Sequence, residues 1–83
     1  MSIEQTIRNY ILENYLFTDD QSTLQNDESF LNKGIIDSTG ILELIGFLGE
    51  ELGVTVKDEE MVPENLDSVN NLVAFVARKG QAG

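Results

Sequence analysis

The sequence contains no cysteine and no histidine among its 83 residues. Without cysteine the chain forms no disulfide and no thiolate metal site, and it has no thiol of its own to hold a thioester. Without histidine it lacks the usual catalytic imidazole and the usual nitrogen ligand of zinc. An acid–base enzyme that uses carboxylates alone is left open, but a domain of this size offers little concave pocket for a substrate. We therefore do not expect an enzyme.

Positive charge is also scarce, because the chain has 15 acidic residues and only 5 basic ones, with a net charge of −10. A charge of this sign repels nucleic-acid phosphates and anionic membrane surfaces, and it favours encounter with basic protein surfaces. Alternatively, the acidity only keeps a small protein soluble. The charge argues against nucleic acid as a partner and leaves these two explanations open.

Long apolar runs are absent as well. No stretch approaches the roughly 20 apolar residues of a membrane helix, and the N-terminus shows no basic segment followed by an apolar run, which is the pattern of a signal peptide. We therefore expect no membrane insertion and a cytoplasmic location. The length predicts one small domain over residues 1–83, with its core over about residues 3–79, and we expect a monomer.

The spacing of the apolar residues predicts an all-α fold. Three main helices are expected over about residues 3–16, over residues 38–52, and from residue 67 or 68 to a stop at Gly80. A short helical turn is expected over residues 62–66, with a proline at its first helical position. Between the first two main helices lies a long polar loop with Leu24 as its only apolar anchor. The prediction is a small four-helix bundle, with three main helices, one short helix and a long first loop.

The second main helix begins at the most informative position of the chain. Asp37 is a typical N-cap residue, and Ser38 follows it as the first helical residue. The free backbone N–H groups and the positive dipole end of a helix N-terminus favour a phosphate, so Ser38 is a candidate for modification by a phosphate-bearing group. The alternative interpretation is that Ser38 is an ordinary capping residue.

The same helix has an apolar face and an outward polar face. The outward face combines small, hydroxyl and acidic residues, namely Thr39, Glu43, Gly46 and Glu50. Glycines also stand at positions 40 and 49, and an exposed helical glycine costs up to about 1 kcal/mol relative to alanine. Either a ligand or partner approaches the helix closely at the glycines, or a neighbouring helix packs tightly against them.

The chain resembles the family of acyl, peptidyl and aminoacyl carrier proteins over about residues 7–78. The resemblance rests on Asp37-Ser38 at the start of the second helix, Gly34-Ile35-Ile36 before it and Glu43-Leu44 after it. The spacing to Val54-Thr55-Val56, to Pro63-Glu64-Asn65-Leu66 and to the final apolar helix also matches. The Asp-Ser pair alone is weak evidence, and its setting in this order of helices makes it specific.

The resemblance implies that Ser38 receives phosphopantetheine from coenzyme A through a phosphopantetheinyl transferase that uses magnesium. The thiol of this arm would hold acyl or aminoacyl groups as thioesters, and Asp37 would help to position metal and phosphate during the transfer. The outward face of the second helix would meet basic surfaces of partner enzymes, which are the transferase, a loading ligase, and downstream transferases or synthases. The partner-binding residues expected on this basis are Thr39, Leu42, Glu43, Gly46, Glu50 and Met61, of which Leu42 and Met61 are also candidates for apolar contacts with the arm. For Met61 the favoured alternative is a place in the core.

The residues after Ser38 depart from the carriers of fatty-acid synthesis, which usually place leucine there. Here Thr39 and Gly40 follow, and this Ser-x-Gly sequence is similar to aminoacyl, peptidyl and D-alanyl carriers. The departure favours a stand-alone carrier loaded by a dedicated ligase, and it leaves the cargo open.

The competing hypothesis is an unmodified acidic helical module that binds a basic partner through the same helix. Under either hypothesis, Glu43 and Glu50 either contact a partner or form a solvated face. The acidic run at residues 58–60 is predicted to be solvated.

Overall fold

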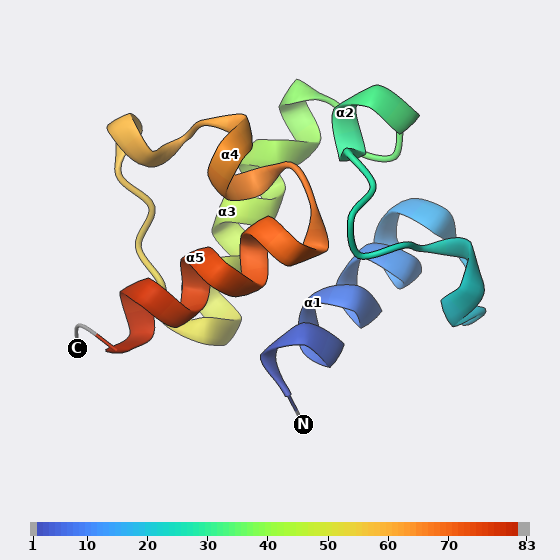
Figure 1. Ribbon diagram of the computed structural model, residues 1–83, viewed down its shortest axis with the longest axis horizontal. Coiled ribbons are helices and arrows are strands. Elements are labelled where there is room, and N and C mark those ends of the chain that lie inside the picture. Colours follow the sequence, from blue (N-terminus) through green and yellow to red (C-terminus); the bar gives the residue numbers. More distant parts are fainter. Residues whose placement is uncertain (1, 82–83) are drawn as a thin grey trace.

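The computed structural model describes residues 2–81, and within this range it contains five α-helices (Figure 1). They are α1 (Ile3–Ile11), α2 (Phe30–Lys33), α3 (Ser38–Leu52), α4 (Pro63–Leu66) and α5 (Val69–Gln81). A π-helical turn, Leu12–Leu16, continues α1, and 3-10 turns lie at Gln21–Thr23 and Asp58–Glu60. No strand occurs in the described range, so the predicted all-α fold with three main helices is confirmed. The bundle was predicted with one short helix; a helical turn at Phe30 and Leu31 that stops at Gly34 also follows from the sequence, and the structure shows it as α2.

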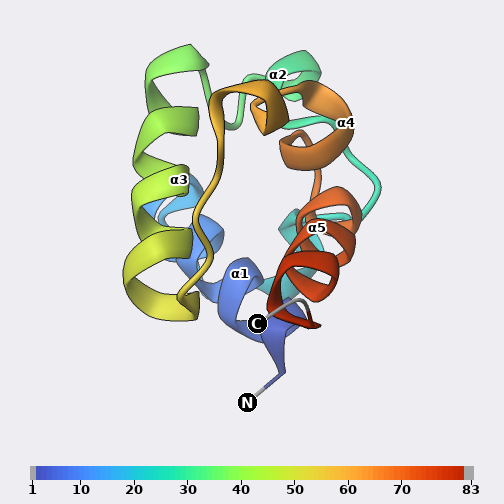
Figure 2. The same ribbon diagram turned by 90° about the vertical axis from the view of Figure 1, so that its left-hand side faces the viewer.

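The two short helices lie at the same end of the molecule as the start of α3. Figures 1 and 2 show α2, α4 and the first turn of α3 together at the upper end. α5 packs against both α1 and α4. This arrangement brings segments that are far apart in the sequence next to the first residue of α3. None of the helices in the described part of the chain has the length and apolar character needed to span a membrane.

The core forms where the apolar faces of the three long helices meet. Each large apolar side chain that is removed from water contributes about 1.5–3 kcal/mol to stability. Leu24 of the long first loop is buried with the helical side chains, which confirms its predicted role as an anchor. The buried apolar residues are Ile7, Ile11, Leu12, Leu24, Phe30, Ile36, Leu44, Leu48, Val54, Leu66, Val69, Leu72, Phe75 and Val76.

The long first loop is fixed to the helices by a buried arginine. The Arg8 guanidinium donates hydrogen bonds to the Gln21 side chain (3.1 Å), to the Gln21 carbonyl (2.6 Å) and to the side chain of Asn26. The backbone N–H of Asn70 donates to the carbonyl of Asn26 at 2.9 Å, which joins the loop to α5. The loop therefore supplies the hydrogen-bond acceptors of the Arg8 guanidinium.

The last helix differs slightly from the prediction at both ends. Ser68 lies just before α5, and its hydroxyl accepts the backbone N–H of Asn71 at 3.1 Å, as expected of an N-cap. The expectation that Gly80 ends the helix was wrong, because α5 continues to Gln81. Glycine weakens a helix but ends it mainly when its backbone is left-handed, as at Gly34 (φ 70°) and Gly53 (φ 67°).

Candidate functional site

Ser38 is the first residue of α3, and its side chain is exposed. Asp37 precedes it in an extended conformation, and its Oδ1 accepts the backbone N–H of Gly40 at 2.8 Å. Asp37 is therefore the N-cap of a 15-residue helix, as predicted. Its carboxylate occupies one amide of the first turn, while the backbone N–H groups at the very start of the helix lack intrahelical acceptors. The Ser38 hydroxyl thus stands at the positive end of a long helix.

The turn that leads to Ser38 is built from α2. Gly34 ends α2 with a left-handed backbone (φ 70°), and its N–H donates to the carbonyl of Leu31 at 3.2 Å. The N–H of Ile35 then donates to the carbonyl of Phe30 at 2.9 Å. Buried Ile36 follows. This anchoring fixes where the chain leaves the core, so that Ser38 reaches the surface at a defined position.

Tyr15 holds the first half of α3 against the end of the first helix. Its hydroxyl donates to the carbonyl of Gly40 at 3.2 Å and lies 3.5 Å from the Glu43 carboxylate. Burial, reinforced by Tyr10 and Glu43, raises the pKa of the Tyr15 hydroxyl above its usual value. Tyr10 stacks on Phe47 of α3 with ring centroids 3.9 Å apart. Tyr15 thus holds the first turn of α3 by a hydrogen bond, and Tyr10 packs against the middle of the helix.

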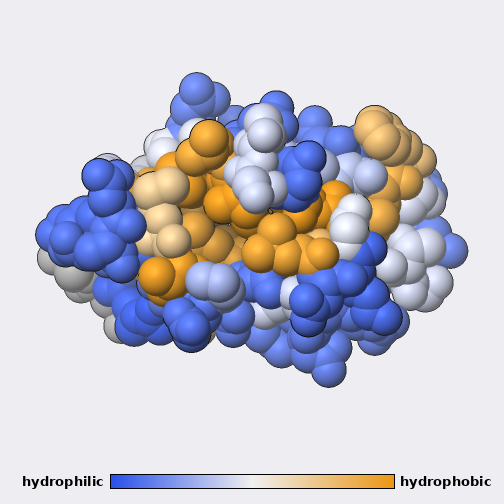
Figure 3. Space-filling view, turned by 90° about the horizontal axis from the view of Figure 1, so that it is seen from above, coloured by the Kyte–Doolittle hydropathy of each residue, from blue (hydrophilic) through white to orange (hydrophobic). Residues whose placement is uncertain are grey.

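Ser38 lines an apolar groove. It has a volume of about 210 Å³, and its walls come from α2, from α3, from α4 and from the segment that leads into α4. Figure 3 shows the corresponding face of the molecule, where an apolar hollow is surrounded by hydrophilic residues. The lining residues are Leu31, Ser38, Ile41, Leu42, Met61, Val62, Pro63, Leu66 and Asp67.

A second hollow adjoins the neighbours of Ser38 in the sequence. It has a volume of about 330 Å³ and is more polar than the groove. The carboxylates of Asp37 and Glu43 lie on its wall, and the Tyr15 side chain also lines it. Ser38 thus lines the apolar groove, while its sequence neighbours Asp37 and Thr39 line the more polar hollow.

Comparison with known proteins identifies the family. The chain is 36% identical over 76 residues to a D-alanyl carrier protein of Streptococcus suis strain 98HAH33, an alignment that covers 92% of each chain. The chain belongs to the acyl carrier protein family. A D-alanyl carrier protein of Streptococcus suis strain 05ZYH33 is 34% identical over 76 residues, again with 92% of each chain covered. The probable acyl carrier protein PigG of Serratia sp. strain ATCC 39006 is 29% identical over 76 residues, which cover 92% of this chain and 86% of that protein.

No protein family model matches the chain. The relatives nevertheless confirm the predicted resemblance, and they favour a carrier protein over the unmodified interaction module.

The structure places the predicted partner-binding residues of this carrier on the surface. Leu42 is 59% exposed and Met61 is 37% exposed, and both line the same groove as Ser38. The predicted partner-binding residues of α3 are all exposed, namely Thr39, Leu42, Glu43, Gly46 and Glu50. These positions form an outward surface that is accessible to a partner, and Met61 adds to it from the segment before α4.

Several residues of the carrier's groove were not anticipated from the sequence. Leu31, Pro63, Leu66 and Asp67 belong to segments that are distant from Ser38 in the chain. The short turn at residues 62–66 was predicted, but its packing beside the start of α3 depends on tertiary contacts. Apolar periodicity reports which side of a helix is buried and does not report which other segment covers it.

Proposed function

We propose that this carrier protein is modified on the Ser38 hydroxyl with phosphopantetheine and holds acyl or aminoacyl groups on that arm. The observation that carries the proposal is the exposed Ser38 at the N-terminus of α3, where it lines the apolar groove. The chain has no cysteine, so a thioester needs a thiol from outside the polypeptide. When bound, phosphopantetheine supplies this thiol.

The residues around Ser38 fit such a group. The first backbone N–H groups of α3 and the positive helix end favour the phosphodiester. The groove offers apolar contacts for the less polar part of the arm, and Leu42 and Met61 would make them. Ser38 itself provides the oxygen of the phosphate ester.

The attachment step needs only the hydroxyl of this chain and a partner transferase. The Ser38 oxygen forms a bond to the phosphorus and loses its proton to a base of the transferase. The bond between that phosphorus and the nucleotide half of coenzyme A breaks in the same step. Asp37, next to Ser38, would help to position the magnesium ion of the transferase and the reacting phosphate, in addition to its capping role.

The exposed surface of α3 would dock the partner enzymes. Glu43 and Glu50 supply negative charge, Leu42 and Met61 supply apolar area, and Thr39 and Gly46 leave low-lying surface between them. Basic surfaces on the phosphopantetheinyl transferase, the loading ligase and downstream enzymes would complement this combination. Docking of this kind needs neither nucleic acid nor membrane insertion.

The cargo of the carrier is inferred from its relatives. Two of them are D-alanyl carrier proteins, and the third is a probable acyl carrier protein. We infer a stand-alone carrier for an aminoacyl or specialised acyl group in preference to the housekeeping fatty-acid carrier. Residues 1–83 would act as one monomeric carrier domain in the cytoplasm, without a catalytic step of its own.

The attachment is tested by intact mass. Wild-type protein, Ser38→Ala and Ser22→Ala are incubated with coenzyme A, magnesium and a broad-specificity phosphopantetheinyl transferase. Ser22 is an exposed serine of the long first loop and serves as the matched control. We expect one added phosphopantetheine on the wild type and on Ser22→Ala, and none on Ser38→Ala. Because Ser38 is exposed, its replacement should change stability by no more than about 0.5 kcal/mol.

Two results would contradict the proposal. The first is retained loading of Ser38→Ala. The second is a folded wild type that gains no mass with two different transferases. In that case the unmodified acidic interaction module would be the better explanation.

A further inference from the structure

One wall of the groove at Ser38 is a segment with little regular structure. Met61 and Val62 line the groove between the 3-10 turn Asp58–Glu60 and the single turn of α4, and Pro63 lines it as the first residue of α4. A one-turn helix is too short to be stable by itself, so tertiary contacts must hold it. The position of this wall therefore depends on what tethers the segment.

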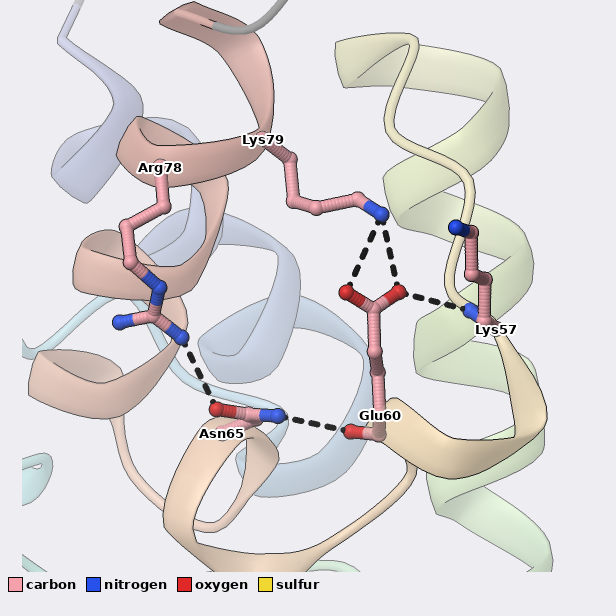
Figure 4. Close-up of polar contacts among 5 residues, drawn as sticks. All are labelled: Lys57, Glu60, Asn65, Arg78 and Lys79. Atoms are coloured by element: carbon pink, nitrogen blue, oxygen red, sulfur yellow. Dashed lines mark hydrogen bonds and ion pairs between the residues drawn. The ribbon is translucent and has the colours of Figure 1, made fainter.

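Glu60 tethers the segment to α5 immediately before Met61. Its carboxylate accepts hydrogen bonds from Lys79 Nζ, at 2.9 Å and 3.2 Å to its two oxygens (Figure 4). One of these oxygens also accepts the backbone N–H of Lys57 at 3.0 Å. The side chains of Glu60 and Lys79 are 24% and 25% exposed, so water and salt screen the pair less than they screen a fully exposed pair. The Lys79 bond and the Lys57 N–H lower the pKa of the Glu60 carboxyl below its usual value.

Asn65 makes a second connection to α5, at the other end of the wall. Its side-chain N–H donates to the carbonyl of Glu60 at 2.9 Å, and its oxygen accepts a hydrogen bond from Arg78 at 3.0 Å. Figure 4 shows Arg78 and Lys79 reaching from α5 to these two positions. We call the contacts of Glu60 with Lys79 and of Asn65 with Arg78 the α5 latch. Its two contacts, at Glu60 and Asn65, lie on either side of the wall residues in the sequence.

The two ends of the wall differ in what else holds them. Toward its C-terminal end, Leu66 is buried and the carbonyl of Pro63 accepts a hydrogen bond from Asn71 at 3.2 Å. Met61, at the N-terminal end, is 37% exposed and directly follows Glu60. Release of the latch should therefore free Met61 more than Leu66.

We propose that Glu60 is a positioning residue of the carrier, which sets the groove beside Ser38 by holding the Met61 end of its wall through Lys79. The chain has only 5 basic residues, and two of them take part in the latch. The effect on the arm rests on the proposed function, whereas the effect on the wall does not. While the contacts of the α5 latch are formed, the groove keeps one shape and is preorganised for the arm.

The proposal is tested with the ε-methyl signal of Met61. The chain has two methionines, Met1 and Met61, so a protein labelled with ¹³C at the methionine methyl groups gives a spectrum that is simple to assign. The test variants are Glu60→Gln and Lys79→Gln, which remove the ion pair from opposite sides. The matched controls are Glu59→Gln, an exposed carboxylate on the same turn, and Lys33→Gln, an exposed lysine of α2. Circular dichroism checks that each variant is folded.

In the unmodified protein we expect the exchange broadening of the Met61 methyl to rise about two- to fivefold in both test variants. In samples that are labelled at the leucine methyl groups as well, the Leu66 signals should change less, and the two controls should match the wild type. A Met61 signal in Glu60→Gln and Lys79→Gln that matches Glu59→Gln and Lys33→Gln would overturn the proposal.

The same variants are then loaded with phosphopantetheine. We expect cross-relaxation between the arm and the Met61 methyl in the wild type, and its reduction by about half or more in the two latch variants. If no variant and no wild-type sample is loaded, the proposed function fails, while the comparison in the unmodified protein still decides the role of Glu60. If the arm loads but its contact with Met61 is equal in all samples, Glu60 does not position the groove for the arm.

Discussion

Gly40 and Gly46 both lie in α3, but their surroundings differ. A Cβ atom added at Gly40 would lie 2.7 Å from Ile36 Cγ2 and 3.2 Å from Tyr15 Cε1. A Cβ atom added at Gly46 would have no neighbour within 4 Å. Of the two explanations considered for the helix glycines, tight packing therefore accounts for Gly40. Gly46 is left on the open surface that we propose for docking.

Substitution of these glycines by alanine should change stability in opposite directions. Gly40→Ala forces a methyl group against buried Ile36, so we expect it to lower the free energy of unfolding by about 1 kcal/mol even after the gain in helix propensity. Gly46→Ala has space for the methyl group and should raise the free energy of unfolding by up to about 1 kcal/mol. Urea unfolding of both variants measures the difference. Equal signs for the two changes would contradict this account of Gly40.

The packing of Gly40 also bears on the cargo. The Ser-x-Gly sequence at Ser38 was interpreted as a sign of aminoacyl, peptidyl or D-alanyl carriers. In the structure, Ile36 and Tyr15 pack so closely against Gly40 that they leave little room for a Cβ atom. The proposal of an aminoacyl or specialised acyl cargo therefore rests on the relatives more than on Gly40.

At the scale of the helices, the stability of α3 depends on its N-cap residue, Asp37. The Asp37 carboxylate caps the N–H of Gly40, and the same carboxylate is proposed to help position magnesium during loading. Asn caps a helix nearly as well as Asp, so the two roles are separable.

Asp37→Ala should lower the free energy of unfolding by about 1 kcal/mol, whereas Asp37→Asn should keep most of the capping energy. Both variants should be loaded more slowly than the wild type, because both lack the negative charge. Thermal unfolding measures the stability that is lost with the cap. The initial rate of mass gain measures how the charge of the carboxylate affects loading. Wild-type loading of Asp37→Asn would show that the carboxylate acts only as a cap.

The main helices could be predicted from the sequence because their signals are local. Asp37 and Gly53 at the ends of α3 and the apolar spacing within it give its bounds directly, and Ser38 is found by its place after the cap. The π-helical winding of Leu12–Leu16 has no comparable signal, since apolar spacing alone does not distinguish it from an α-helix. The helix was predicted to reach residue 16, and the winding of its last turn was not predicted.

The wall of the groove could not be predicted because it depends on distant contacts. Asp58 and Glu59 are exposed as expected, but the expectation that Glu60 is solvated was wrong, because Lys79 of α5 binds it. Asp67 is a similar case, since its carboxylate accepts the hydroxyl of Ser29 and the backbone N–H of Leu31 (3.0 Å). The residues of such a pair are far apart in the sequence, and the residues around each one do not indicate its partner.

At the scale of the whole molecule, the negative charge is concentrated in a small volume. The net charge of −10 is carried by a chain with a radius of gyration of 11.8 Å. Among the side chains that the structure describes, the one ion pair joins Glu60 and Lys79, and the buried cation Arg8 binds neutral oxygens. Most carboxylates therefore repel one another without a local cation to offset them.

Added salt should stabilise the protein for this reason. The screening length falls from about 10 Å at 0.1 M to about 3 Å at 1 M, which is from about the radius of the molecule to well below it. We expect the midpoint of thermal unfolding to rise by about 4–8 °C over this range of sodium chloride, corresponding to about 1 kcal/mol. A variant with Glu13→Gln and Asp19→Asn, both exposed, should unfold at a higher temperature in low salt and respond less to added salt. If the midpoint stayed constant or fell in both proteins, local pairs such as Glu60 with Lys79 would outweigh the general repulsion, because screening weakens attraction and repulsion alike.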